Sequence, residues 1–269
     1  MKGAALKGKG SLACVGLGMT LGAHISPRSR NHIAAADVVF AAVSDPIVEL
    51  WLQEMHPNVQ SLQPFYGVGK SRHETYREMV AAMLDEVRKG KKVCGAFYGH
   101  PGVFARAPHV AVAQALAEGF DAVMEPGISA EDCLYADLGI DPGQFGCQHY
   151  EASQLMFYRR RIDPSAYLVL WQVGVAGDRS FGRFSTSPER LQLLVERLSE
   201  DYPLDHGCLL YEAPTLALHV ARKEPIELRK LPNAALDIKT TMVLPPAIGM
   251  EANTSMLAKL NELGPGLDG

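Results

Sequence analysis

The chain has 269 residues, of which 47% are apolar and 21% charged, and its net charge is −4. This composition is typical of a globular protein with one large domain or two small ones, and the mildly acidic balance argues against nonspecific nucleic-acid binding. No apolar run approaches ~20 residues and no signal-peptide pattern opens the chain, so neither a membrane partner nor secretion is expected.

Strands and helices alternate through the first half of the chain. We expect strands at residues 11–15, 38–42, 61–62, 93–97 and 121–124. We expect helices at residues 28–36, 45–55, 72–89 and 108–117, and another that begins after Ser129. Asp45 before Pro46 is a helix cap, and Ser71 with Glu74 has the spacing of a capping box. Strands separated by helices predict a mainly parallel sheet.

The pattern changes near Asp141-Pro142-Gly143, after which helices become fewer and strands shorter. Strands are expected at residues 166–171, 208–211, 226–228 and 240–244, and a helix at 188–198. This pattern favours a mixed sheet. We therefore predict an α/β protein with an N-terminal domain over residues 1–128 and a C-terminal domain over 129–250. A tail with a short helical piece follows at 251–269.

The five cysteines are odd in number, scattered and without a CxxC pair, which indicates neither a disulfide framework nor a zinc site. A reducing cytoplasm is the expected location. Five of the histidines also lack the spacing of zinc ligands, so no metal site is predicted. These are His24, His32, His73, His109 and His149.

Glycine and proline gather where the predicted strands end. The clearest case is Tyr98-Gly99-His100-Pro101-Gly102-Val103-Phe104, and Glu125-Pro126-Gly127-Ile128-Ser129-Ala130 is similar. In open α/β sheets, small ligands bind beyond the carboxyl ends of the strands. Gly16-Leu17-Gly18 lacks the rest of the dinucleotide-binding fingerprint, so a nucleotide-binding Rossmann domain is not expected.

The order and spacing of these loops, from about residue 11 to 245, resemble the tetrapyrrole methylase superfamily. The resemblance implies two α/β domains with an active-site cleft between them, in which S-adenosylmethionine binds folded and S-adenosylhomocysteine is the product. Tyr66, Arg72 and Tyr76, together with the two loops above and Tyr211-Glu212-Ala213-Pro214, look more closely like the borosin α-N-methyltransferases. That family methylates backbone amides of a ribosomally made peptide.

Fungal borosin enzymes carry their substrate as a C-terminal extension, whereas this chain stops at Gly269 without an apolar core peptide. It therefore resembles the free-standing bacterial type, which acts on a separate precursor. The resemblance also implies a homodimer that binds one precursor on each subunit, as a heterotetramer.

An amide nitrogen is a poor nucleophile because its lone pair is delocalised into the carbonyl. Arg72 and Tyr76 share a helix face at i,i+4, and the Arg72 charge favours a phenolate at Tyr76. We hypothesise that Tyr76 accepts the amide proton, that Arg72 polarises the developing imidate, and that Tyr66 holds the peptide carbonyl or shares the proton. Tyr98 is expected to face the cleft near the methyl group. The structural alternative is that Tyr76 only heads an apolar core stripe and Arg72 pairs at the surface.

The cofactor contacts follow from the resemblance alone. It places the methionine and sulfonium end against Gly99, His100, Val103 and Phe104, with His100 as a loop anchor rather than a base. It places the amino-acid portion against Ser129 and Ala130, and the adenosine against Gln172, Ala213 and Thr241.

Two other functions remain open from the sequence. A corrin or porphyrin C-methyltransferase has the same cofactor loops but does not need Tyr66, Arg72 and Tyr76 together. A noncatalytic cofactor-binding or scaffold subunit binds the cofactor without turnover.

Overall fold

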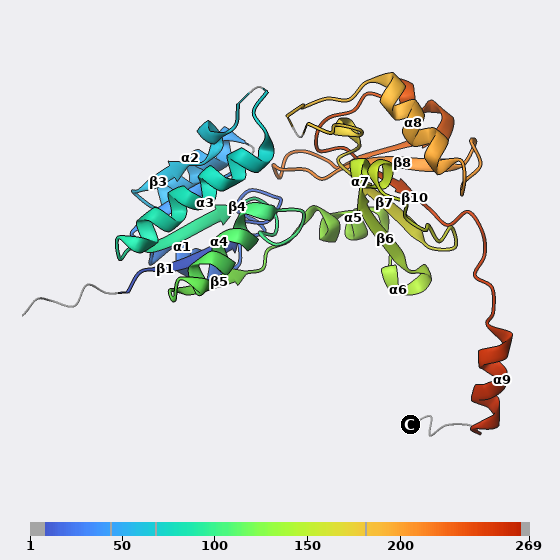
Figure 1. Ribbon diagram of the computed structural model, residues 1–269, viewed down its shortest axis with the longest axis horizontal. Coiled ribbons are helices and arrows are strands. Elements are labelled where there is room, and N and C mark those ends of the chain that lie inside the picture. The colour runs from blue at the N-terminus through green and yellow to red at the C-terminus, as the bar shows by residue number, and fades with distance from the viewer. Residues whose placement is uncertain (1–8, 44, 68, 181, 265–269) are drawn as a thin grey trace, which may run out of the picture.

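The computed structural model describes residues 9–43, 45–67, 69–180 and 182–264. It contains two five-stranded sheets, one from each half of the chain, which lie side by side (Figure 1). No helix within these described ranges is both long and apolar enough to cross a membrane.

The first sheet is wholly parallel, with strand order β3-β2-β4-β1-β5. Its strands are β1 (Ser11–Gly16), β2 (Val38–Ala42), β3 (Val59–Ser61), β4 (Lys92–Phe97) and β5 (Asp121–Glu125). Its helices are α1 (Pro27–Ala34), α2 (Pro46–Met55), α3 (Arg72–Arg88) and α4 (Arg106–Ala117). Alternate strand residues face two separate cores: α1 and α2 cover one face, and α3 and α4 the other. The strands are therefore apolar on both faces, as expected for a parallel sheet buried between helices.

The second sheet is mixed, with order β6-β7-β10-β8-β9, and only its β6–β7 pair is parallel. Its strands are β6 (Cys147–Glu151), β7 (Tyr167–Trp171), β8 (Gly207–Glu212), β9 (Arg222–Glu227) and β10 (Thr241–Leu244). The helices of this half are α5 (Ala130–Leu138), α6 (Pro142–Phe145), α7 (Ala152–Phe157), α8 (Pro188–Leu198) and α9 (Thr254–Glu262).

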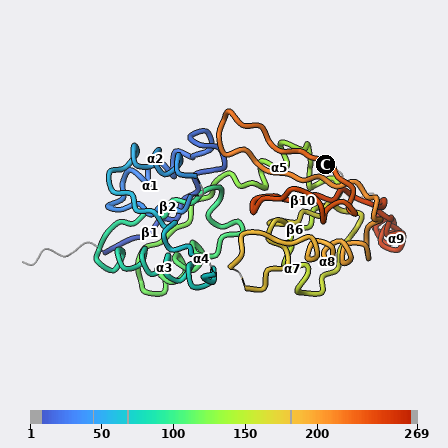
Figure 2. The backbone as a smooth tube through the Cα atoms, turned by 90° about the horizontal axis from the view of Figure 1, so that it is seen from above, coloured from blue at the N-terminus to red at the C-terminus, as the bar shows by residue number. Residues whose placement is uncertain are grey.

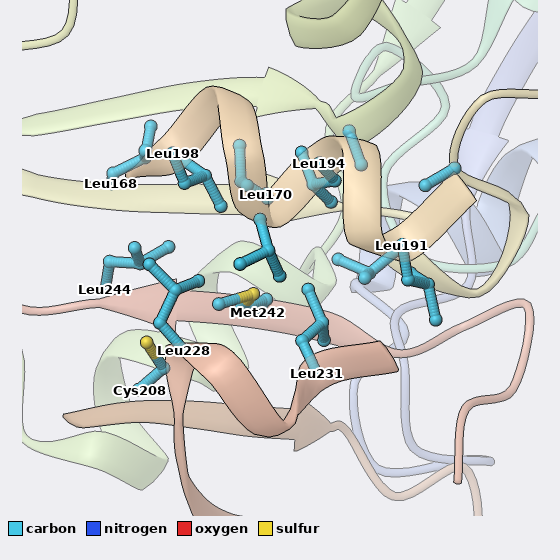
Figure 3. Close-up of a cluster of buried hydrophobic side chains, with 14 of the residues drawn as sticks. Leu168, Leu170, Leu191, Leu194, Leu198, Cys208, Leu228, Leu231, Met242 and Leu244 are labelled. Carbon is cyan, nitrogen blue, oxygen red and sulfur yellow. The ribbon is translucent and has the colours of Figure 1, made fainter. Parts of the chain in front are cut away.

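Two cores stabilise the second sheet. On one face, Leu168, Leu170 and Met242 pack against α8 and the 3-10 segment η3 (Leu228–Asn233), as Figure 3 shows. On the other face, Val169, Trp171 and Val243 pack with Leu134 and other residues of the α5 region. Helix α5 thus lies between the second sheet and the loops of the first.

The predicted fold class is confirmed, and the elements agree with the expectation to within one or two residues over most of the chain. The domain division at residue 128 stays a prediction, and it falls in the loop between β5 and α5. The prediction omitted β6, α6 and α7. The prediction of a capping box at α3 was wrong. The Ser71 hydroxyl accepts a hydrogen bond from the backbone amide of His73 (3.3 Å) instead of from that of the third helical residue. A capping box does form at α5, between Ser129 and Asp132.

Candidate active site

Three strand-end loops of the first sheet meet backbone to backbone. A Cβ on Gly16 would lie 2.6 Å from the Gly99 oxygen, and a Cβ on Gly127 only 2.3 Å from the same oxygen. Gly18 and Gly99 exchange two backbone hydrogen bonds, of 3.1 and 2.9 Å. Only glycine allows this approach, so the carboxyl edge of the sheet is an array of main-chain groups, as the loop pattern predicted.

The loop after β4 is held by histidine side chains. His100 Nδ1 accepts a hydrogen bond from the Gly102 amide (2.8 Å), and His109 Nε2 lies 2.9 Å from the Gly102 oxygen. The Val103 amide donates to the His100 carbonyl (3.2 Å), which closes the turn. The geometry agrees with the anchoring role predicted for His100. Phe104 follows in a left-handed conformation, with φ of 49°, and the residue is 44% exposed.

The four residues predicted to be catalytic come together beside this edge. Tyr66 lies on the loop between the 3-10 turn η1 (Gln63–Phe65) and α3, Arg72 and Tyr76 lie in the first two turns of α3, and Tyr98 follows β4. The pKa of Tyr66 is raised, first by burial and then by the neighbouring Tyr76 and Tyr98, while Arg72 opposes that rise. Tyr66 also shares a side-chain hydrogen bond with Tyr76. The pKa of Tyr98 is raised too, first by desolvation and then by Tyr76, again against Arg72.

The Tyr66 loop is fastened to helix α3. The Phe65 carbonyl accepts from Thr75 Oγ1 (3.2 Å) and from Lys70 Nζ (3.0 Å), and Lys70 also pairs with Glu78. Tyr76 packs against the core that contains Met79, Val80 and Met83. Tyr76 is therefore both a core neighbour and a member of the tyrosine–arginine cluster, and the two interpretations of this residue are compatible.

The second half of the chain also reaches this cluster, which the sequence did not predict. Arg72 Nη2 donates to the carbonyl of Arg183 (3.4 Å). Glu151, at the end of β6, is half-buried, and desolvation raises the pKa of its carboxyl while Arg72 lowers it. Glu151 escaped notice because Cys147, His149 and Glu151 share one face of β6, which lacks apolar alternation.

The remaining predicted cofactor residues fall into two groups. Ser129 lies at the N-terminus of α5, and its Cα would be 3.9 Å from a Cβ on Gly99, so Ser129 and Ala130 belong with the first edge. Gln172, Ala213 and Thr241 gather at one edge of the second sheet, where the Val173 amide donates to the Thr240 carbonyl and Thr240 Oγ1 donates to Glu212.

Two contacts join these groups across the halves. The Phe104 and Trp171 rings lie 5.3 Å apart between centroids, at 43°. The Leu21 amide donates to the Thr215 carbonyl (3.0 Å), and Figure 2 shows the orange segment after β8 reaching the blue segment after β1. A pocket lined by Leu17, Tyr98 and Thr215, among others, lies at this junction. The residues that the structure describes hold no group of three or more His, Cys, Asp or Glu suited to a metal ion.

Comparison with known proteins agrees with this architecture. The family described as Tetrapyrrole (Corrin/Porphyrin) Methylases matches residues 11–226, and the chain belongs to that family. A uroporphyrin-III-C-methyltransferase from Thermus thermophilus superposes with a TM-score of 0.62 at 19% identity, over 97% of this chain and 99% of that one. A cobalt-precorrin-4 methyltransferase superposes with a TM-score of 0.61 at 17% identity, over 88% and 95%. At such identities the likeness shows the fold alone.

Relatives with higher sequence identity are fungal proteins whose names join a methyltransferase to a ribosomally synthesized cyclic peptide precursor. The gymnopeptides precursor of Gymnopus fusipes is 44% identical over 218 residues, covering 80% of this chain and 51% of that protein. The omphalotin A precursor of Omphalotus olearius is 37% identical over 261 residues, covering 96% and 63%. A type I borosin precursor of Coprinopsis marcescibilis is 40% identical over 262 residues, covering 94% and 67%. The chain thus spans roughly half to two thirds of the length of these relatives.

Proposed function

We propose that this chain is a methyltransferase that moves the methyl group of S-adenosylmethionine to backbone amide nitrogens of a ribosomally made precursor peptide. The observation that carries the proposal is the cluster of Tyr66, Arg72, Tyr76 and Tyr98 at the carboxyl edge of the first sheet. The names of the fungal relatives, which combine a methyltransferase with a peptide precursor, support the same substrate class.

The residues around this edge fit the proposed methyl donor. The main chain of Gly99, which carries no side chain of its own, suits the charged methionine end, and Ser129 at the start of α5 suits its carboxylate. The partly exposed rings of Phe104 and Tyr98 provide apolar and aromatic surface beside it. When bound, S-adenosylmethionine supplies a methyl group on a positively charged sulfur. Gln172, Ala213 and Thr241 are the proposed adenosine contacts.

The tyrosine–arginine cluster would make the amide nitrogen, a poor nucleophile on its own, able to accept the methyl group. A tyrosine hydroxyl is protonated at neutral pH, and the raised pKa values of Tyr66 and Tyr98 strengthen that preference, so both are suited to donate hydrogen bonds to the amide oxygen. Arg72 adds a fixed positive charge beside the oxygen as it gains negative charge. Tyr76 is the proposed acceptor of the proton from nitrogen. The N–H bond breaks, the new N–CH3 bond forms, and the electron pair of the broken S–CH3 bond stays on sulfur.

The proposed assembly is a homodimer that binds two separate precursor proteins, as in a free-standing bacterial enzyme. Helix α9 supports dimerisation: it projects away from both sheets (Figure 1), and Met256, Leu257, Leu260 and Leu263 are each about half exposed or more. A nine-residue helix with such an apolar stripe needs a partner surface for stability. The five free cysteines fit the proposed cytoplasmic location.

A direct test offers two substrates to the same protein. The chain is incubated with S-adenosylmethionine and either a peptide carrying the core sequence of a fungal relative or a uroporphyrinogen. We expect the peptide to gain methylene mass increments that fragmentation places on backbone nitrogen. Methylation of the tetrapyrrole alone would support the C-methyltransferase instead. Donor binding with turnover of neither substrate, nor of peptides encoded beside the gene, would support the scaffold subunit.

A further inference from the structure

A continuous chain of hydrogen bonds crosses α5, β6 and β7. Trp171 Nε1 lies 3.1 Å from His149 Nδ1, and the Tyr135 hydroxyl lies 2.8 Å from His149 Nε2. The same Tyr135 hydroxyl donates to Glu131 Oε1 at 3.0 Å. The β6–β7 register pairs His149 with Val169 and Glu151 with Trp171, so His149 and Trp171 are diagonal neighbours on one face of the sheet. We call these four residues the His149 relay.

The direction of each bond follows from the chemistry of the groups. An indole N–H can only donate, so Trp171 donates and His149 Nδ1 must be the bare, accepting nitrogen. The ring proton then lies on Nε2 and is donated to the Tyr135 oxygen, which leaves the Tyr135 O–H for the Glu131 carboxylate. The relay is thus fully satisfied with His149 neutral. An imidazolium ring would carry a proton on Nδ1 facing the Trp171 N–H, and that bond would be lost.

The relay touches three segments that the proposed cofactor site uses. Glu131 directly follows Ala130, and Trp171 directly precedes Gln172. The Trp171 ring contacts that of Phe104, from the other half of the chain. Gln172 and Phe104 are the two non-glycine residues with positive φ in the described chain, at 57° and 49°. Such conformations are costly and persist only where the surroundings hold them.

We propose that His149 is a positioning residue, which in its neutral form holds Trp171, and through it Phe104 and the Gln172 turn, in the geometry that binds the methyl donor. Protonation of His149 then releases Trp171 and weakens donor binding. The inference rests on the proposed function for the identity of the donor, although the hydrogen bonds themselves do not depend on it.

The surroundings of His149 set the direction of this pH effect. Helix α5 presents Glu131 and Tyr135 to the ring, β6 carries Cys147 and Glu151 on the same face, and β7 contributes Trp171. Desolvation lowers the pKa of His149, and Glu131 opposes that shift in part. The ring is therefore neutral at physiological pH, and donor binding is lost as the pH falls below the ordinary histidine value of about 6.5.

The first test needs no substrate. Trp51 and Trp171 are the two tryptophans of the chain, so the W51F variant reports Trp171 alone. We expect Trp171 fluorescence to titrate below about pH 6.5, because an adjacent imidazolium quenches indole emission. The additional substitution His149→Gln, which keeps one acceptor and one donor without a titrating proton, should abolish the transition. The exposed His219→Gln serves as the matched control and should leave it in place. A transition that persists in H149Q overturns the relay.

The second test measures S-adenosylhomocysteine affinity by calorimetry across the same pH range. In the wild type, Kd should rise roughly tenfold on acidification, the size expected for one buried hydrogen bond. H149Q should bind with near wild-type affinity and lose this pH dependence, whereas H149F should bind weakly at every pH while keeping its helical circular dichroism. Comparison with H149Q separates His149 from His100, whose Nδ1 also accepts a hydrogen bond.

These outcomes separate the two proposals. Equal pH dependence in wild type and H149Q, or unchanged affinity in H149F, contradicts the positioning role. Normal donor binding without peptide methylation contradicts the proposed function and leaves the positioning role intact. A protein that binds no S-adenosylhomocysteine at any pH contradicts the proposed cofactor, and the positioning role falls with it.

Discussion

The two sheet edges that form the candidate site are held together by different kinds of contact. At the first edge, Gly16, Gly99 and Gly127 bring main chain against main chain, with no room for a Cβ on the first or the last. At the second edge, side-chain hydrogen bonds hold the segments together: Thr240 Oγ1 and Arg222 Nη1 both donate to Glu212 Oε1 at 2.7 Å. A main-chain array is sensitive to added volume, whereas a side-chain network is sensitive to the loss of one partner.

The largest effect is expected on turnover, from a substitution in the tyrosine–arginine cluster beside the first edge. Tyr76→Phe keeps the ring that packs on the α3 core and removes only the hydroxyl proposed to accept the amide proton. Turnover should fall by about 10²- to 10⁴-fold, the usual contribution of a general base, with donor affinity unchanged. Single-turnover mass spectrometry and calorimetry measure the two quantities.

The matched control for this substitution is Tyr158→Phe, because Tyr158 is 63% exposed and lies after α7 in the second half. It should retain wild-type turnover. If Tyr76→Phe also retained full turnover with intact donor binding, the base would have to be sought elsewhere in the cluster.

The main-chain array itself can be tested by adding one methyl group. Gly127→Ala would place a Cβ 2.3 Å from the Gly99 oxygen and 2.8 Å from the Gly16 Cα. Backbone cannot yield as a side-chain tip can, so we expect a loss of about 1–3 kcal/mol in the free energy of unfolding. Urea denaturation measures it. Gly249→Ala, where nothing lies within 4 Å, should change stability by less than about 0.5 kcal/mol. Equal stability of the two variants would show that the loops separate readily.

The same contrast explains what the sequence could predict. Main-chain edges leave local signals, because glycine and proline at strand ends are visible in the sequence, and the parallel sheet follows from the alternation of strands and helices. The set of Tyr66, Arg72 and Tyr76 was predicted from the resemblance to the borosin enzymes, and spacing added only that Arg72 and Tyr76 share a helix face. Tyr98 was assigned to the same site because it lies in the loop that follows a predicted strand.

The side-chain edge left no such signal. Cys147, His149 and Glu151 lie on one face of β6. Because the segment lacks the alternation of apolar and polar residues, its sequence does not mark it as a strand. The partners of His149 are 14 and 22 residues away, a separation that only the fold closes. From the sequence, His149 was only one of five histidines without the spacing of zinc ligands. The structure shows that both of its ring nitrogens have hydrogen-bond partners.

A smaller effect is expected from removing one partner in the second half. The Tyr211 hydroxyl donates to Asp137 Oδ2 at 2.8 Å, which ties β8 to α5. Tyr211→Phe would leave that partly exposed carboxylate without the donor at little change in volume, so the free energy of unfolding should fall by about 0.5–1.5 kcal/mol. Urea denaturation near neutral pH measures the loss. An unchanged value would show that solvent replaces the tyrosine at Asp137 without cost.

The smallest effect, and the opposite sign, is expected at Tyr202 in the core on the other face of the same sheet. Its hydroxyl is buried and has no hydrogen-bond partner among the described residues, while its ring packs 5.1 Å from that of His206. Tyr202→Phe keeps the packing and removes a desolvated, unpaired polar group, so it should raise the free energy of unfolding by up to about 1 kcal/mol. Because Tyr202 and Tyr211 are both buried tyrosines of one half, the two Phe variants differ chiefly in whether a hydrogen bond is lost. Destabilisation of Tyr202→Phe to the same extent as Tyr211→Phe would mean that the buried Tyr202 hydroxyl has a stabilising partner, such as a buried water.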